Sequence, residues 1–223
     1  MAAAAFDEIL AAANTRHGAA AVEARLPRPR SAEELSATPD HRFLSQMSRR
    51  IFQAGLKHSM VDGKWPAFEE VFHGFDPRRI RAMPDEALEA LLGDARLIRH
   101  WGKLKSVRDN AAAMLAVSEE HGGFGRWLAG WPGGDIVGLW EALAKRFSQM
   151  GGNSGPSFLR MVGKDTFILS PSVVAALQHW AALAPSKNRG GRAAAQALFN
   201  RWAAESGRPL SQISLILAMS VDG

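Results

Sequence analysis

Cysteine and tyrosine are both absent from this sequence of 223 residues. Without cysteine the chain cannot form disulfides, offer a thiolate nucleophile, ligate an iron–sulfur cluster or build a cysteine-based zinc site. The absence also fits a reducing compartment. Without tyrosine, stacking on a flat ligand is left to tryptophan, phenylalanine and histidine.

Long apolar runs are missing as well, and no stretch approaches the roughly 20 residues that a membrane-spanning helix needs. The N-terminal sequence carries Asp7 and Glu8 where a secretion signal would be positively charged. We therefore expect a soluble, cytoplasmic protein with no membrane partner. A composition of 47% hydrophobic and 22% charged residues is ordinary for a globular protein and excludes global disorder.

Strand signals are scarce, and the one candidate strand is the short segment 166–169. Apolar residues instead recur at helical spacing, as Phe43, Leu44, Met47, Ile51 and Phe52 do. We therefore predict an all-α fold. The pattern predicts helices over residues 6–18, 40–56, 98–116, 136–149, 157–162, 172–184, 193–206 and 210–219, and shorter ones after Ser31, Asp76 and Pro84.

Several catalytic signatures are missing. The sequence has no G-x-x-x-x-G-K-[ST] loop, no G-x-G-x-x-G after a strand and no G-x-S-x-G elbow, which removes support for nucleotide-binding folds and serine hydrolysis. The seven histidines include no pair spaced i,i+3 or i,i+4. We expect neither a metal site nor a cofactor.

Positive charge is in modest excess, with 27 Lys and Arg against 22 Asp and Glu. The net charge of +5 permits a polyanionic partner but does not identify one. Basic residues gather in two runs, 94–109 and 187–208. In the first run Arg96, Arg99 and Lys103 are spaced by three and four, so we expect them to share one helix face. A solvated surface is the alternative interpretation of either run.

A glycine-rich turn precedes Pro156 and is the most informative local feature. Its residues are Gly151, Gly152, Asn153, Ser154 and Gly155. Glycines let a backbone approach a phosphate closely, and the positive end of the following helix favours an anion there. The alternative is a bare connection between two helices.

Three further segments carry a family resemblance. They are Gln53-Ala54-Gly55-Leu56, the run F-H-G-F-D-P from Phe72 to Pro77, and the run I-R-H-W-G-K-L from Ile98 to Leu104, followed by Asn110-Ala111. Together they resemble the DNA-3-methyladenine glycosylase I family of the helix–hairpin–helix superfamily in one register over residues 43–115. A weaker similarity over 151–177 is like a helix–hairpin–helix unit.

The resemblance implies a compact helical DNA glycosylase fold in a single domain over residues 1–223. We expect an N-terminal helical extension over 1–39, the family core over 40–120, the helix–hairpin–helix region over 135–185 and C-terminal helices over 186–223. It also implies a monofunctional, monomeric enzyme of base-excision repair. Such an enzyme flips alkylated purines such as 3-methyladenine out of duplex DNA and hydrolyses their N-glycosidic bonds.

The predicted base pocket combines resemblance with aromatic residues in lysine-bearing segments, and comprises Arg50, Gln53, His58, Trp65 and Trp101. The predicted DNA-binding residues comprise Gly151, Gly152, Asn153, Ser154, Gly155, Lys103 and Lys164. Ser170 stands where related superfamilies carry a catalytic aspartate, so no catalytic residue is assigned.

The best-known family members carry a glutamate and a tryptophan where this chain has Arg50 and His58, and they hold a zinc ion through cysteines that are missing here. These departures leave an alternative open. The chain is then a DNA-binding protein that keeps the glycosylase fold and has lost or altered excision.

Overall fold

The computed structural model describes residues 3–186 and 188–221, and all of its regular elements in that part of the chain are helical. The all-α prediction is confirmed. The α-helices are α1 (Phe6–His17), α2 (Ala19–Arg25), α3 (Ala32–Ser36), α4 (Asp40–Gln53), α5 (His58–Val71), α6 (Pro77–Arg81), α7 (Asp85–Ala90), α8 (Trp101–His121), α9 (Phe124–Gly130), α10 (Ile136–Arg146), α11 (Ser154–Val162), α12 (Pro171–Ala181), α13 (Arg189–Ser206) and α14 (Leu210–Met219). Short 3-10 turns are η1 (His73–Phe75), η2 (Leu91–Gly93) and η3 (Gly133–Asp135). None of these helices combines the length and the apolar character needed to cross a bilayer.

The chain divides into two compact units. The central unit comprises Ser31–Trp131 and Glu141–Val162. The terminal unit comprises Met1–Arg30, Pro132–Trp140 and Gly163–Gly223. The single domain expected from the sequence stays a prediction.

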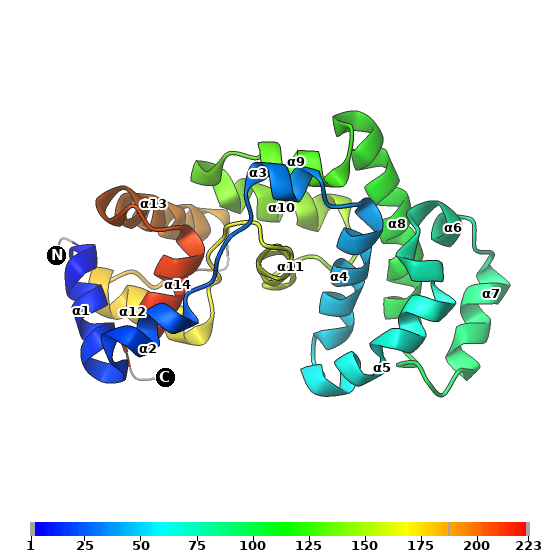
Figure 1. Cartoon of the computed structure of the whole chain (residues 1–223), viewed down its shortest axis with the longest axis horizontal. Coiled ribbons are helices and arrows are strands. Elements are labelled where there is room, and N and C mark those ends of the chain that lie inside the picture. The colour runs from blue at the N-terminus through cyan, green and yellow to red at the C-terminus, as the bar shows by residue number, and fades with distance from the viewer. Residues whose placement is uncertain (1–2, 187, 222–223) are drawn as a thin grey trace. The chain divides into compact units, whose positions relative to one another are not determined.

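Helix α4 organises the central unit. Its predicted apolar face is buried throughout, and it packs against α5, α8, α9 and α11. Figure 1 shows α4 (blue) beside α8 (green). Leu104, Val107, Ala111 and Met114 line the buried side of α8. The 3.6-residue period of the sequence therefore locates this core correctly.

Helix α5 was not predicted, because Gly63 and Pro66 interrupt it. Tertiary packing overrides these two residues. Trp65 is only 5% exposed, and its ring stacks with Phe68 at 5.1 Å and with Phe75 at 5.3 Å between centroids. Its indole N–H donates to the Ser45 hydroxyl at 3.1 Å. Both the apolar ring and the polar nitrogen of Trp65 are satisfied within the core.

The terminal unit has its own core. The rings of Phe167 and Phe199 stack at 4.1 Å, and Trp140 meets Phe167 edge-on. The segment 166–169, the one candidate strand, is irregular in the structure. Ser170 begins α12 as its N-cap, accepting a hydrogen bond from the Val173 N–H. The side chain therefore has a structural role.

Two predicted boundaries differ from the structure in ways that matter for the site. Helix α8 begins at Trp101, because the His100 side chain caps it by accepting from the Lys103 N–H. Arg96 and Arg99 lie in the preceding loop, so they do not share a helix face with Lys103. Helix α11 begins at Ser154, and the turn before it is shorter than predicted.

Replacing Trp65 tests the assignment of that residue to the core. Trp65→Ala should lower the free energy of unfolding by about 3–5 kcal/mol, because it removes a large buried ring and leaves a cavity. The matched variant is Trp101→Ala, which truncates an exposed tryptophan and should change stability by less than about 0.5 kcal/mol. Urea unfolding followed by circular dichroism measures both. Equal effects would contradict the assignment.

Candidate functional site

The end of α4 and the beginning of α5 bring three of the predicted base-pocket residues into one region. Arg50 and Gln53 lie in the last turn of α4, and exposed His58 begins α5. The Gln53 amide donates to Asp62 Oδ1 at 3.0 Å, and Arg49 Nε donates to the same oxygen at 2.8 Å. These bonds fix the first turns of α5 against the end of α4.

Asp62 is a charged residue of this region that sequence reasoning missed. The hydrogen bond from Arg49 lowers the pKa of its carboxyl below the usual value, with smaller contributions from Gln53 and His58. Asp62 follows His58 by four residues and so shares its face of α5. This spacing was the available signal, but it carries meaning only once the segment is known to be a helix.

Arg50 is the unusual cation of the region. Its side chain is half-buried, and its Nε is inaccessible to solvent without a hydrogen-bond partner. Among the described residues the guanidinium makes no hydrogen bond and no ion pair. Burial lowers the pKa of Arg50, and no carboxylate acts to raise it. An unpartnered, partly desolvated charge of this kind is costly for a fold to keep.

Lys103 lies beside this cation but is occupied. It is only 9% exposed, and its Nζ donates to the carbonyl of Phe52 at 3.2 Å and to that of Ala54 at 2.7 Å. Burial first, and the charge of Arg50 second, lower the pKa of Lys103. These carbonyls belong to the unsatisfied end of α4, so Lys103 acts as its C-terminal cap. The prediction that Lys103 faces DNA does not fit this burial.

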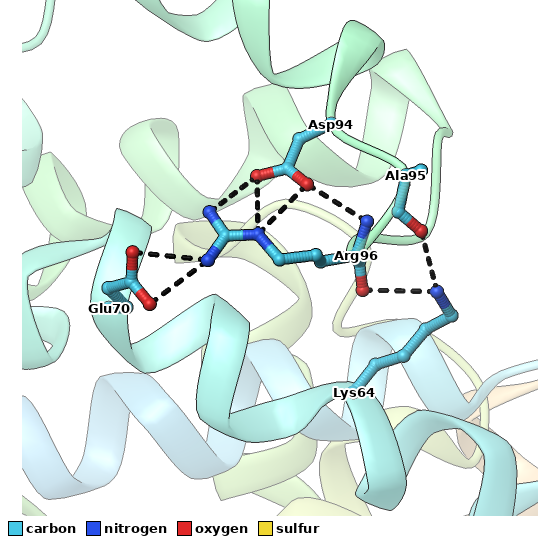
Figure 2. Close-up of polar contacts among 5 residues, drawn as sticks. All are labelled: Lys64, Glu70, Asp94, Ala95 and Arg96. Carbon is cyan, nitrogen blue, oxygen red and sulfur yellow. Dashed lines mark hydrogen bonds and ion pairs between the residues drawn. The ribbon is translucent and has the colours of Figure 1, made fainter.

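The loop before α8 is held against α5 by a charged network (Figure 2). The Arg96 guanidinium lies between Asp94 and Glu70, with Nη2 2.8 Å from Asp94 Oδ2 and Nη1 3.0 Å from Glu70 Oε2. Lys64 Nζ donates to the Ala95 and Arg96 carbonyls at 2.9 and 3.1 Å. Exposed ion pairs are individually weak, but this set joins one loop to one helix and positions the start of α8.

Much of the predicted basic run is therefore paired. Lys105 binds Asp109 one turn further along α8, and Arg108 binds Asp85. Arg99 makes no hydrogen bond or ion pair within the described part of the chain. A run of basic residues in the sequence is thus mostly a set of internal contacts.

The two tryptophans predicted for the base pocket have different environments. Trp65 lies in the core and presents no exposed ring, so a base-stacking role does not fit its position. Trp101 is 37% exposed at the first residue of α8. The side chain of Gln149 donates to the carbonyl of Gly102 at 2.7 Å, which holds the segment before α11 close to Trp101.

The turn between α10 and α11 is clamped to α8. The Asn110 amide accepts from the Ser148 N–H at 2.7 Å and donates to the Ser148 carbonyl at 3.2 Å. Gly151, Gly152 and Asn153 are exposed. A Cβ at Gly151 would meet no atom within 4 Å, and Gly152 has the left-handed φ of +59° that glycine tolerates best.

The remaining predicted DNA-binding residues are not part of this exposed segment. Ser154 and Gly155 belong to α11, and Gly155 is buried. Lys164 belongs to the terminal unit and is only 8% exposed, with a pKa lowered by burial. The open part of the turn is therefore the segment 151–153.

A separate cleft of about 730 Å³ opens at the other end of α4, lined by Asp40, His41, Asp76, Pro77, Arg78, Arg81, Leu115, Ser118 and Glu119. Asp40 is engaged there, accepting from the Phe124 N–H and from the Ser118 hydroxyl. The described residues hold no cluster of three or more histidine, aspartate or glutamate side chains arranged to bind a metal ion.

Comparison with known proteins gives the family. The model of the methyladenine glycosylase family matches residues 36–149 of the chain, about half its length. The chain belongs to the methyladenine glycosylase family. The match includes α4, α5, α8 and α10, and with them Arg50, Asp62 and Lys103.

Curated relatives within this family match a shorter segment. DNA-3-methyladenine glycosylase 1 of Escherichia coli is 40% identical over 67 residues, covering 30% of this chain and 36% of that protein. DNA-3-methyladenine glycosylase of Haemophilus influenzae is 39% identical over 67 residues, with the same coverage of 30% and 36%. The matched segment thus spans about a third of the length of these curated relatives.

Solved structures of the family extend the likeness. A crystal structure of 3-methyladenine DNA glycosylase I has a TM-score of 0.50 and 28% identity, covering 65% of this chain and 86% of that one. The Staphylococcus aureus 3-methyladenine DNA glycosylase I has a TM-score of 0.52 at 17% identity, covering 68% and 91%. The second likeness supports the fold alone.

Lys103 offers a test of how the family core is held. Lys103→Met should lower the free energy of unfolding by about 1–2 kcal/mol, because two carbonyls of α4 lose a charged donor while the desolvation of the ammonium is relieved. Lys105→Met is the matched control on the same helix. It removes an exposed ion pair and should cost about 0.5 kcal/mol or less. If the two variants unfold at the same urea concentration, the capping role is wrong.

Proposed function

We propose that this protein is a monofunctional DNA glycosylase of base-excision repair. It flips alkylated purines such as 3-methyladenine out of duplex DNA and hydrolyses the N-glycosidic bond. The observation that carries the proposal is the family match over residues 36–149, which contains the end of α4, the beginning of α5 and the start of α8. The names of the curated relatives support the same activity. We expect the enzyme to act as a monomer in the cytoplasm.

In this proposal the exposed segment 151–153 binds the DNA backbone. Its amides and the N-terminus of α11 offer donors to a phosphate, and the glycines let the backbone approach it. Two contacts with α8 keep the turn in place: Asn110 of α8 accepts from the Ser148 N–H, and the Gln149 side chain donates to the carbonyl of Gly102 in α8. Trp101 supplies an exposed ring beside it for stacking on DNA.

The flipped base enters the region formed by Arg50, Gln53 and His58. Flipping costs a few kcal/mol, and least for a damaged base that pairs poorly. A cationic alkylated base is already a good leaving group, so positioning and electrostatics suffice, with water attacking the sugar carbon as the base departs. The Asp62 carboxylate is ionised, and His58 interacts with its charge. This carboxylate is suited to face the positive charge that develops on the sugar.

A second candidate function rests on Arg50. An unpartnered guanidinium stands where the best-known family members carry a glutamate, which favours a protein that binds DNA without releasing 3-methyladenine. It predicts salt-sensitive DNA binding, because phosphate contacts displace counterions, and no free base.

Release of free bases decides between the two functions. The purified protein should release alkylated purines from methylated duplex DNA faster than the spontaneous rate, as measured by mass spectrometry of the soluble fraction. Circular dichroism confirms folding in the same sample. Binding of duplex DNA without release would support the second function, and the absence of both binding and release would reject both.

Gly151→Glu tests the turn as a phosphate-binding element. The new side chain projects into open space without strain, and its negative charge should weaken duplex DNA binding by about tenfold at about 0.1 M salt. Gly130→Glu is the matched control, because a Cβ there also meets no atom within 4 Å. Fluorescence anisotropy with labelled duplex measures both affinities. An equal loss in the two variants would show that only net charge matters.

A further inference from the structure

The Arg50 guanidinium lacks a partner in the described structure although much of it is withdrawn from water. Its Nε is fully buried without a hydrogen bond. Because Arg50 makes no other hydrogen bond or ion pair with described residues, its outer nitrogens are left to meet solvent or a ligand. A planar cation with free donors is well suited to pair with an acceptor edge.

The surroundings of Arg50 contain no charge that would reverse this preference. Asp62, the carboxylate of the region, is held by Arg49 and Gln53 rather than by Arg50. Lys103 interacts with the charge of Arg50, and its ammonium is used by the Phe52 and Ala54 carbonyls. The Arg50 guanidinium carries only donors, so the groups it attracts are hydrogen-bond acceptors.

Purines differ at the edge that such a group would read. Guanine and hypoxanthine present two acceptors, O6 and N7, which an arginine binds with two parallel hydrogen bonds. Adenine presents an amino donor at position 6, which meets the arginine N–H groups donor to donor. Resting on the proposed glycosylase function, we propose that Arg50 is a specificity-determining residue that selects alkylated purines with oxygen at position 6, such as 3-methylguanine, over 3-methyladenine.

The comparison of 3-methylguanine with 3-methyladenine isolates this preference. Both bases are methylated at the same atom and are cationic in DNA, so repulsion by Arg50 acts on both alike. They differ at the edge that carries the 6-position.

The test measures both methylated bases released from one preparation of methylated duplex DNA, each corrected for its spontaneous release. The unsubstituted protein should accelerate 3-methylguanine release more than 3-methyladenine release. Arg50→Met keeps the length of the side chain and removes its donors, so the ratio of the two accelerations should fall by about tenfold. Arg50→Glu should lower the ratio further, because a carboxylate accepts from the amino group of adenine. The positive charge of Lys103, which acts on Arg50 in the unsubstituted protein, would stabilise that carboxylate.

Arg79→Met is the matched control, because Arg79 is an exposed arginine on α6 whose side chain takes no part in the proposed pocket. It should leave the ratio unchanged.

Three results overturn the inference. An unchanged ratio in Arg50→Met means that Arg50 does not read the base. An equal loss for both bases, together with a smaller dependence of DNA affinity on salt, assigns Arg50 to a backbone phosphate and leaves the proposed function standing. No release of any base by the folded, unsubstituted protein rejects the proposed function itself, and this inference with it.

Discussion

The cap that Lys103 places on the end of α4 is the interaction on which the rest of the site depends. Its ammonium binds the Phe52 and Ala54 carbonyls and so closes α4 just before Gly55, whose φ of +79° turns the chain toward α5. The same lysine lies in the first turn of α8. One buried cation therefore joins the end of α4, which carries Arg50, to α8, against which the glycine turn is held. It also holds the end of α4 from which the chain turns toward α5 and His58.

This arrangement carries an electrostatic cost that ordinary packing would avoid. Two cations lie close together in partly desolvated positions, and the pKa of each is lowered by burial. Lys103 recovers part of that cost through two carbonyls, whereas Arg50 recovers none within the described structure. Local rules of protein structure are broken most often where a protein binds something. The unpartnered Arg50 beside the hydrogen-bonded Lys103 therefore points to a ligand.

Periodicity and resemblance predicted α4, the core beneath it and the family, because an apolar stripe of period 3.6 is a local property of the sequence. They could not separate Trp65 from Trp101. Both tryptophans stand close to a lysine in sequence, and only the stacking of Phe68 and Phe75 on Trp65 decides which ring is buried. Helix α5 was not predicted for the same reason, because its tertiary contacts outweigh the low helix propensity of Gly63 and Pro66.

The net charge of +5 proves a poor guide to how this protein would hold DNA. Arg96, Lys105 and Arg108 are engaged with carboxylates, and Lys103 and Lys164 are buried. Groups of another kind are also available: the backbone amides of an exposed glycine turn, the exposed ring of Trp101 and the half-buried guanidinium of Arg50. Binding by such groups depends on geometry more than on summed charge. The clamp of Asn110 on Ser148 and the Lys103 cap on α4 therefore hold the turn and the helix that carries Arg50 in the geometry that the proposed function needs.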